Sequence, residues 1–153
     1  MQFETLLAPR RVQHGVEGVS KKRVLETIAN IIATDIPSLD ADTLFRSLIA
    51  REKLGSTGLG HGIAIPHCRV ASCESTIGAL VVLSSPIDFD AIDGAPVDVI
   101  FTLMVPEEAS SEHLQTLAKL AELFQQEEFR AALRTAETSD LLYSRVSAYL
   151  ATQ

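Results

Sequence analysis

The sequence has few cysteines, no tryptophan and no long apolar run. Its two cysteines, Cys68 and Cys73, are too few for a disulfide framework in a chain that shows no export signal, so we expect reduced thiols. The longest apolar run, Gly78 to Leu83, is far too short to cross a bilayer. Met1 to Arg10 has no apolar core of the kind a signal peptide needs. We therefore expect a cytoplasmic protein without membrane insertion.

Positive charge is also scarce. The chain has 13 lysines and arginines against 20 acidic residues, which gives a formal net charge of −7 and a pI near 5.0. Nucleic-acid binding needs clustered positive charge to neutralise phosphates, so we expect no nucleic-acid partner. An acidic protein is better suited to basic partners.

The bulk composition is that of an ordinary globular protein. Apolar residues make up 46% of the 153 residues and charged residues 22%, both near the average for soluble domains. This excludes the disordered and fibrous classes. A chain of this length is expected to bury one core, so we predict a single domain over residues 1–153.

Two helices are predicted in the first third of the chain. Ser20 is a good N-cap, and apolar residues at helical spacing predict a helix over Lys21–Ala33. Asp40 is the next cap, and a second apolar stripe predicts a helix that ends near Lys53. That stripe consists of Leu44, Phe45, Leu48 and Ile49. Residues 1–19 lack a strong period and are interpreted as an edge element or loop.

Strands and further helices follow. Thr76–Leu83 is apolar on both faces, and Val97–Val105 is rich in β-branched residues, so both are predicted to be long strands. Helices are predicted to begin near Ser111, Glu128 and Asp140. The apolar stripe of the first of them is Leu114, Leu117, Ala118, Ala121 and Phe124. This order predicts a layered α/β sandwich and leaves open whether its sheet is mixed or parallel.

The most unusual stretch runs from Gly55 to His67. Four of its first eight residues are glycine, which lets another group approach the backbone closely and is typical of an anion-binding loop. Ile63–Ile65 is predicted to be a short buried strand, followed by a turn-like stretch through Ser72 and Ser75. Because proline cannot donate to a sheet ladder, Pro66 is expected to end the strand and leave His67 fixed and accessible at its end.

His67 is the first candidate for chemistry. If one ring N–H is tied to a backbone carbonyl, the other nitrogen is free to act as a nucleophile or proton acceptor. The alternative is a histidine that only forms a local hydrogen bond. The adjoining loop has no Gly-Lys-Ser/Thr ending and leads into a strand, which excludes a Walker-type or dinucleotide motif. An irregular connection without function is the remaining alternative for the loop.

Arg51 and His113 are the other two candidates. Arg51 continues the stripe of the second helix, where its fork of donors suits phosphate oxygens. Its alternative role is to complement the negative end of the helix dipole. His113 falls in the first turn of the helix that begins near Ser111, where an anion is favoured. Alone, His113 would be a solvated surface histidine.

A metal site was weighed against these residues. His61, His67, Cys68 and Cys73 are zinc-compatible ligands within a short stretch. Their spacing matches no common zinc finger, and adjacent residues of an extended chain point in opposite directions. We therefore expect no metal and no other cofactor.

The segment Gly62-Ile63-Ala64-Ile65-Pro66-His67, preceded by Arg51-Glu52 and by Ser56 to Gly60, resembles the active-site segment of a known family. That family is the fructose/mannitol-type IIA domains of the bacterial phosphotransferase system. The stretch Ser20 to Glu26 and the absence of an attached transport domain resemble its stand-alone, nitrogen-regulatory (PtsN-type) members. The resemblance covers essentially the whole chain and implies a mixed sheet between helical layers.

The resemblance also implies roles for the candidate residues. It implies that His67 accepts a phosphoryl group from a phosphohistidine on an HPr-like or NPr-like carrier, and that Arg51 and His113 are the family's arginine and second histidine. Phosphoryl transfer mainly asks a protein for positioning and charge stabilisation. We accordingly expect four backbone positions of the glycine loop to bind phosphate oxygens: Thr57, Gly58, Gly60 and Gly62.

Three functions follow as hypotheses. The first is a phosphorelay protein that also regulates target proteins by contact. The second is a binding module that has lost phosphorylation, and the third is a sugar-transport component that passes phosphate to a permease domain. The sequence leaves the oligomeric state open, a homodimer included.

Overall fold

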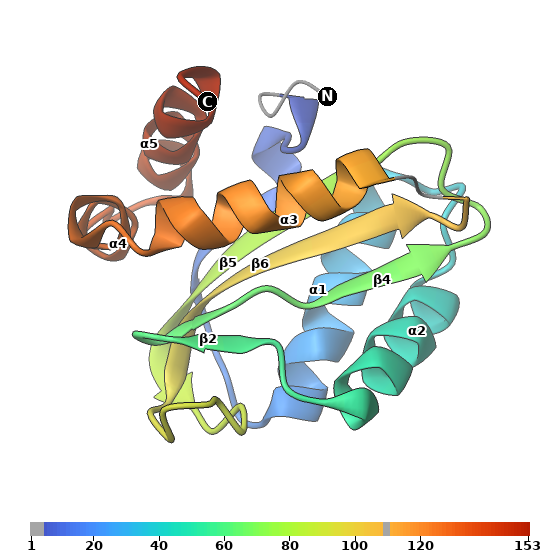
Figure 1. Ribbon diagram of the computed structural model, residues 1–153, viewed down its shortest axis with the longest axis horizontal. Coiled ribbons are helices and arrows are strands. Elements are labelled where there is room, and N and C mark those ends of the chain that lie inside the picture. The colour runs from blue at the N-terminus through green and yellow to red at the C-terminus, as the bar shows by residue number, and fades with distance from the viewer. Residues whose placement is uncertain (1–4, 109–110) are drawn as a thin grey trace.

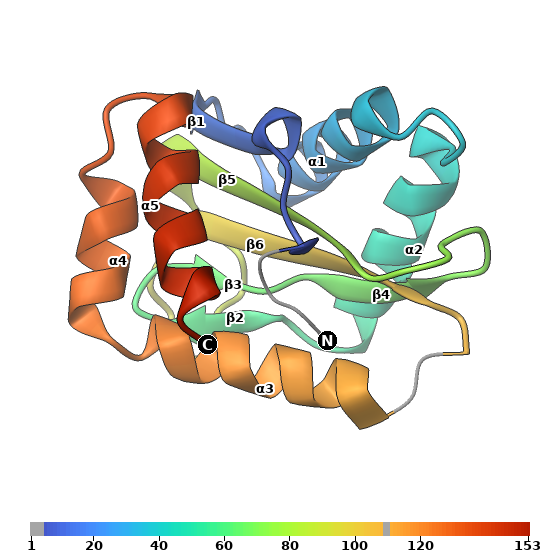
Figure 2. The ribbon, with the colours of Figure 1, turned by 90° about the horizontal axis from the view of Figure 1, so that it is seen from above.

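The computed structural model describes residues 5–108 and 111–153, with only the backbone at residues 111–113. One mixed β-sheet lies between two layers of helices (Figure 1). One face is covered by α1 (Lys21–Asp35) and α2 (Ala41–Leu54), the other by α3 (Ser111–Phe124), α4 (Glu127–Arg134) and α5 (Ser139–Ala151) (Figure 2). The predicted α/β sandwich with a mixed sheet is confirmed.

The centre of the sheet is β6. The strands are β1 (Val12–Val16), β2 (Gly58–Gly60), β3 (Ile63–Ala64), β4 (His67–Val70), β5 (Ile77–Ile87) and β6 (Val97–Pro106), and a short 3-10 helix, η2 (Pro9–Arg11), precedes β1. The order is β1-β5-β6-β3-β2, and β4 also pairs with β6. β5 is antiparallel to β6, whereas β3 and β4 both run parallel to it. β1 is an edge strand, as one of the two interpretations of residues 1–19 predicted.

The first two helices begin where their caps predict. The Ser20 hydroxyl oxygen accepts the Arg23 N–H at 3.2 Å, and an Asp40 carboxylate oxygen accepts the Thr43 N–H at 3.0 Å. Hydrogen bonds from the Thr43 side chain and backbone lower the pKa of Asp40. The apolar residues behind these caps pack on the sheet, so local capping and tertiary packing agree.

The two long strands are buried on both faces, as predicted. Phe101 and Leu103 of β6 pack under α3, α4 and α5, whereas Ile100 and Met104 pack under α1 and α2. This alternation gives the protein two apolar cores, one on each face of the sheet. Among the described residues, no helix combines the length and apolar character needed to span a membrane.

Four local predictions were wrong. The glycine stretch contains a strand, β2, and His67 is not the end of an Ile63–Ile65 strand but the first residue of β4, so the turn predicted through Ser72 and Ser75 begins only after Val70. β5 continues through Pro86 to Ile87, past the predicted end at Leu83. On α3, Leu114 is 64% exposed and Ala118 is also exposed, whereas Leu120, which was not part of the predicted stripe, is buried. Glycine and a short polar strand carry little strand signal, so neighbouring strands decide these segments.

Candidate functional site

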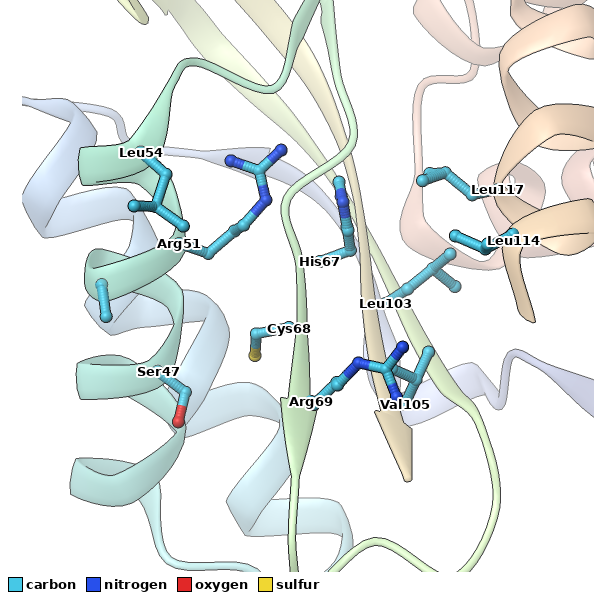
Figure 3. Close-up of a pocket in the computed structure, with 11 residues that line it drawn as sticks. Ser47, Arg51, Leu54, His67, Cys68, Arg69, Leu103, Val105, Leu114 and Leu117 are labelled. Atoms are coloured by element: carbon cyan, nitrogen blue, oxygen red, sulfur yellow. The ribbon is translucent and has the colours of Figure 1, made fainter. Parts of the chain in front are cut away.

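A cleft of about 540 Å³ opens over the β4 edge of the sheet, between α2 and α3 (Figure 3). β4 pairs with β6 alone in the described sheet, so its outer side faces this cleft. The lining residues are Ser47, Ala50, Arg51 and Leu54 from α2, His67, Cys68 and Arg69 from β4, Leu103 and Val105 from β6, and Leu114 and Leu117 from α3. Two of the three predicted catalytic residues, Arg51 and His67, thus lie in one cleft.

His67 is held by strand pairing of its backbone and by one hydrogen bond of its ring. In the sheet, His67 pairs with Leu103 of β6, and the Pro66 carbonyl accepts the Leu103 N–H at 2.9 Å. The ring Nδ1 lies 2.8 Å from the Ile65 carbonyl oxygen. Because a carbonyl only accepts hydrogen bonds, Nδ1 is a protonated nitrogen, so in the neutral ring the lone pair lies on Nε2. The half-buried ring therefore presents Nε2 as its reactive nitrogen.

Two arginines flank this histidine. The Arg51 guanidinium projects from the last turn of α2 on the His67 side, and its Nη1 donates to the Gly55 carbonyl at 2.9 Å (Figure 3). Arg69 lies two residues after His67 on β4, where alternation places both side chains on one face of the strand. Its Nη1 donates to the Glu107 carbonyl at 2.9 Å. Sequence reasoning missed Arg69, and the strand period of two would have found it if β4 had been recognised.

The mouth of the cleft is apolar. Leu54 of α2 is 84% exposed, and Leu114 of α3 is 64% exposed. Both line the cleft, from helices that cover opposite faces of the sheet. Exposed leucines beside charged groups are typical of a surface that a second macromolecule covers. The sequence analysis placed Leu114 in the apolar stripe of its helix and assigned no role to Leu54, so this rim was not predicted.

The third predicted catalytic residue cannot be placed. His113 belongs to the first turn of α3, as predicted, but its side chain lies outside the described residues. Its role stays a prediction.

Both hydrogen-bond donors of Thr57 point to a neighbouring carboxylate. Its hydroxyl and its backbone N–H, the latter at 3.3 Å, both donate to Glu52. Its carbonyl accepts the Ile65 N–H at 3.1 Å. Thr57 therefore contacts the backbone that carries His67, while its own donors point to Glu52.

The other three predicted phosphate-binding residues contact protein rather than the cleft. A Cβ on Gly58 would lie 2.7 Å from the Cβ of Ala91, and one on Gly62 would lie 2.8 Å from a carboxylate oxygen of Asp98. Gly60 and Gly62 have φ of +95° and +78°, which favour glycine. None of the three lines the cleft. Close packing and backbone conformation explain why these positions are glycine.

Cys68 also lines the cleft, but alternation along β4 places its side chain on the face of the strand opposite His67 and Arg69. Its thiol donates to the Met104 sulfur at 3.3 Å, and burial, with a smaller contribution from Cys73, raises its pKa to about 12. Burial raises the pKa of Cys73 as well. Both cysteines are free thiols, and such thiols are poor nucleophiles. In the described part of the chain, no three His, Cys, Asp or Glu side chains gather as a metal site would require.

Comparison with known proteins identifies the family. Residues 5–149 match the family described as phosphoenolpyruvate-dependent sugar phosphotransferase system, EIIA 2. A nitrogen regulatory protein from Pseudomonas aeruginosa is 52% identical over 146 residues, which cover 95% of each chain. A nitrogen regulatory protein from Escherichia coli is 38% identical over 150 residues, covering 96% of this chain and 90% of the relative.

Solved structures agree. The nitrogen regulatory protein IIA-Ntr from Neisseria meningitidis superposes with a TM-score of 0.88 at 40% identity, covering 95% of this chain and 99% of that one. The mannitol IIA protein of Escherichia coli has a TM-score of 0.74 at 17% identity over 92% and 98% of the two chains, which shows a shared fold. The chain therefore belongs to the EIIA type-2 family of the phosphotransferase system, among its nitrogen regulatory proteins.

Proposed function

We propose that this protein is a phosphocarrier that accepts a phosphoryl group on Nε2 of His67 from an HPr-like phosphohistidine protein, and that it regulates partner proteins by contact. The observation that carries the proposal is the 2.8 Å hydrogen bond from His67 Nδ1 to the Ile65 carbonyl. It makes Nδ1 the donor, so in the neutral form of the ring the nucleophilic lone pair is on Nε2.

The transfer is a simple exchange of two N–P bonds. The lone pair of His67 Nε2 forms the new bond to phosphorus as the bond to the donor's imidazole breaks, and the electron pair of that bond returns to the donor ring. The proton on Nδ1 stays in place and keeps its bond to the Ile65 carbonyl. No metal is required for this exchange, because the donor is already a phosphoramidate.

The cations beside His67 would stabilise the transferring group. Arg51 and Arg69 line the same cleft and offer guanidinium donors of the kind that bind phosphate oxygens. His113 is proposed to add a hydrogen bond at the start of α3. Thr57, Gly58, Gly60 and Gly62 stay in the proposal only as support for the backbone that carries His67. Their amides are not counted among the phosphate contacts.

The shape of the cleft favours a protein donor. Its mouth carries the exposed Leu54 and Leu114, whose apolar surface suits the side chains of another protein. An HPr-like carrier that covers both leucines would exclude water from the reacting groups, which strengthens the charge interactions around the phosphoryl group.

Donor-dependent labelling tests the proposal. Incubation with ³²P-labelled phospho-HPr is expected to place one acid-labile phosphate on the protein, and the His67→Ala variant is expected to take up none. His61→Asn is the matched control, because His61 is exposed and has a φ of 57°, which asparagine tolerates. It should label like the wild type. Phosphorus and nitrogen NMR of the labelled protein should place the phosphate on Nε2.

Two results would overturn this assignment. Label that persists in His67→Ala would place the acceptor elsewhere. A wild-type protein that takes no label from any phosphohistidine donor, yet retains partner proteins in pull-down experiments, would be a regulatory module that acts by contact alone.

A further inference from the structure

An ion pair with a buried carboxylate joins the start of α1 to the last turn of α2. Lys21 Nζ, at the start of α1, is 2.7 Å from a carboxylate oxygen of Glu52 in the last turn of α2. The Glu52 side chain is only 4% exposed. The ammonium group also lies 4.7 Å from the centre of the Phe89 ring and 3.8 Å from Asp90. Burying two charges costs free energy, and such pairs are weak stabilisers compared with apolar packing. Stability alone is therefore a poor reason for this pair.

The pair is the start of a chain of hydrogen bonds that ends at His67. The Glu52 carboxylate accepts the hydroxyl and the N–H of Thr57. The Thr57 carbonyl accepts the Ile65 N–H at 3.1 Å, and the Ile65 carbonyl accepts His67 Nδ1–H at 2.8 Å. Each link fixes the position of the next, so the carbonyl that sets the ring of His67 depends on the carboxylate of Glu52.

The same segment also supports Arg51. The Gly55 N–H donates to the Glu52 carbonyl at 3.1 Å, and the Gly55 carbonyl accepts Arg51 Nη1–H at 2.9 Å. The two groups proposed to act on the phosphate, one on α2 and one on β4, are thus both held through residues 52–57.

We infer that Glu52 and Thr57, with Lys21 as the counter-charge, are positioning residues for phosphorylation of His67. The inference rests on the proposed function. Their task is to keep the Ile65 carbonyl where it holds the proton on Nδ1, so that Nε2 is unprotonated and aimed into the cleft. The tautomer of a histidine is set by the hydrogen bond of its other nitrogen, and outer partners that fix this bond govern reactivity. Loss of the support lets the ring populate both tautomers.

Two substitutions of one residue separate positioning from packing. Thr57→Val keeps the branched shape and removes the hydroxyl, whereas Thr57→Ser keeps the hydroxyl and removes a methyl group. The first readout is the tautomer of His67 in the unphosphorylated protein, measured by ¹⁵N NMR of the ring. We expect the Nδ1–H form in the wild type and in Thr57→Ser, and a mixture of the two tautomers in Thr57→Val.

The second readout is the rate of transfer from phosphorylated HPr. At saturating donor, Thr57→Val should be slower by about tenfold or more with an unchanged KM for the donor, because small misplacements of reacting groups are costly. Thr57→Ser should stay within about threefold of the wild type. A direct contact between Thr57 and the phosphate would slow transfer without altering the tautomer, and would overturn the inference.

An unchanged tautomer and rate in Thr57→Val would overturn it as well. If Thr57→Val does not fold, the same two measurements are made on Thr57→Ala, which leaves room for water at the Glu52 carboxylate. The same tautomer and rate results decide the inference. The tautomer needs no donor. A wild type that accepts no phosphate but shows the expected tautomers would therefore contradict the proposed function and leave the positioning role standing.

Discussion

Residues 58–62 and residues 65–67 lie close together in sequence but contact different parts of the protein. The first group packs against the 88–98 region, where Gly58 meets Ala91 and Gly62 meets Asp98. The second leads into the cleft, where His67 lies with Arg51. The glycines allow the backbone to pass close to other protein atoms, whereas the half-buried histidine lines the cleft. A dense run of glycines beside a reactive residue is thus explained by packing that positions the residue.

The arginines beside these two groups of residues also differ in their partners. Arg134, whose guanidinium lies against Gly62, is paired with Asp98 at 2.8 Å. Arg51, beside His67, has no carboxylate partner among the described residues. A neutralised arginine serves structure, whereas an arginine without a counter-ion is available to an incoming phosphate. This contrast can be tested by removing one group at a time.

The largest effect is expected from Arg51→Ala. Removing a donor aimed at the transferring group should slow phosphoryl transfer by about 100-fold, while the free energy of unfolding changes by less than about 1 kcal/mol. Transfer rates and urea unfolding measure the two quantities. Arg46→Ala is the control, because Arg46 lies on α2 in an exposed pair with Asp42 and outside the cleft. Equal rates for Arg51→Ala and Arg46→Ala would remove Arg51 from the site.

The elements that this comparison rests on were predictable to different degrees. The helices α1 and α2 are predictable because the cap and the apolar stripe of each give the same answer locally. β5 and β6 are predictable because strands buried on both faces are continuous apolar runs. β4 is not, since its pattern is short and includes His67 and Arg69, and only pairing with β6 makes it a strand.

The residues of the candidate site were also predictable only in part. The histidine and Arg51 were found from residue type, spacing and family resemblance, and the structure places both in one cleft. The exposed rim was missed because apolar periodicity does not distinguish a leucine that packs on the core from one that borders a cleft. Arg69 was missed because β4 was not recognised as a strand. The role of Glu52 was missed as well, because a buried acid in a helix has no local signature.

Gly58→Ala is expected to act on stability rather than on transfer. Its added Cβ would lie 2.9 Å from the backbone Cα of Ala91, which cannot move aside easily. We expect a loss of about 1–3 kcal/mol in the free energy of unfolding, measured with urea, and an unchanged transfer rate per folded molecule.

Gly94→Ala provides the comparison for that substitution. An added Cβ there meets nothing within 4 Å, but the φ of +72° is unfavourable for alanine, so its cost reports backbone strain without a clash. If Gly58→Ala slowed transfer while unfolding like the wild type, the glycine would be present for the phosphate, and the contrast between the two halves of the segment would fail.

The smallest effect is expected at the rim. Leu54→Ser should raise the KM for an HPr-like donor by about fivefold, since a peripheral apolar contact contributes about 1 kcal/mol to binding. The transfer rate at saturating donor and the free energy of unfolding should both stay unchanged, because a side chain that is 84% exposed packs against little of its own protein.

Val19→Ser is the matched control: Val19 is 80% exposed and does not line the cleft. A rise in KM for both variants would indicate a general loss of surface apolarity, and a rise for neither would show that the donor approaches His67 without covering Leu54. Only a rise confined to Leu54→Ser makes the exposed leucine part of the surface on which the phosphoryl donor docks.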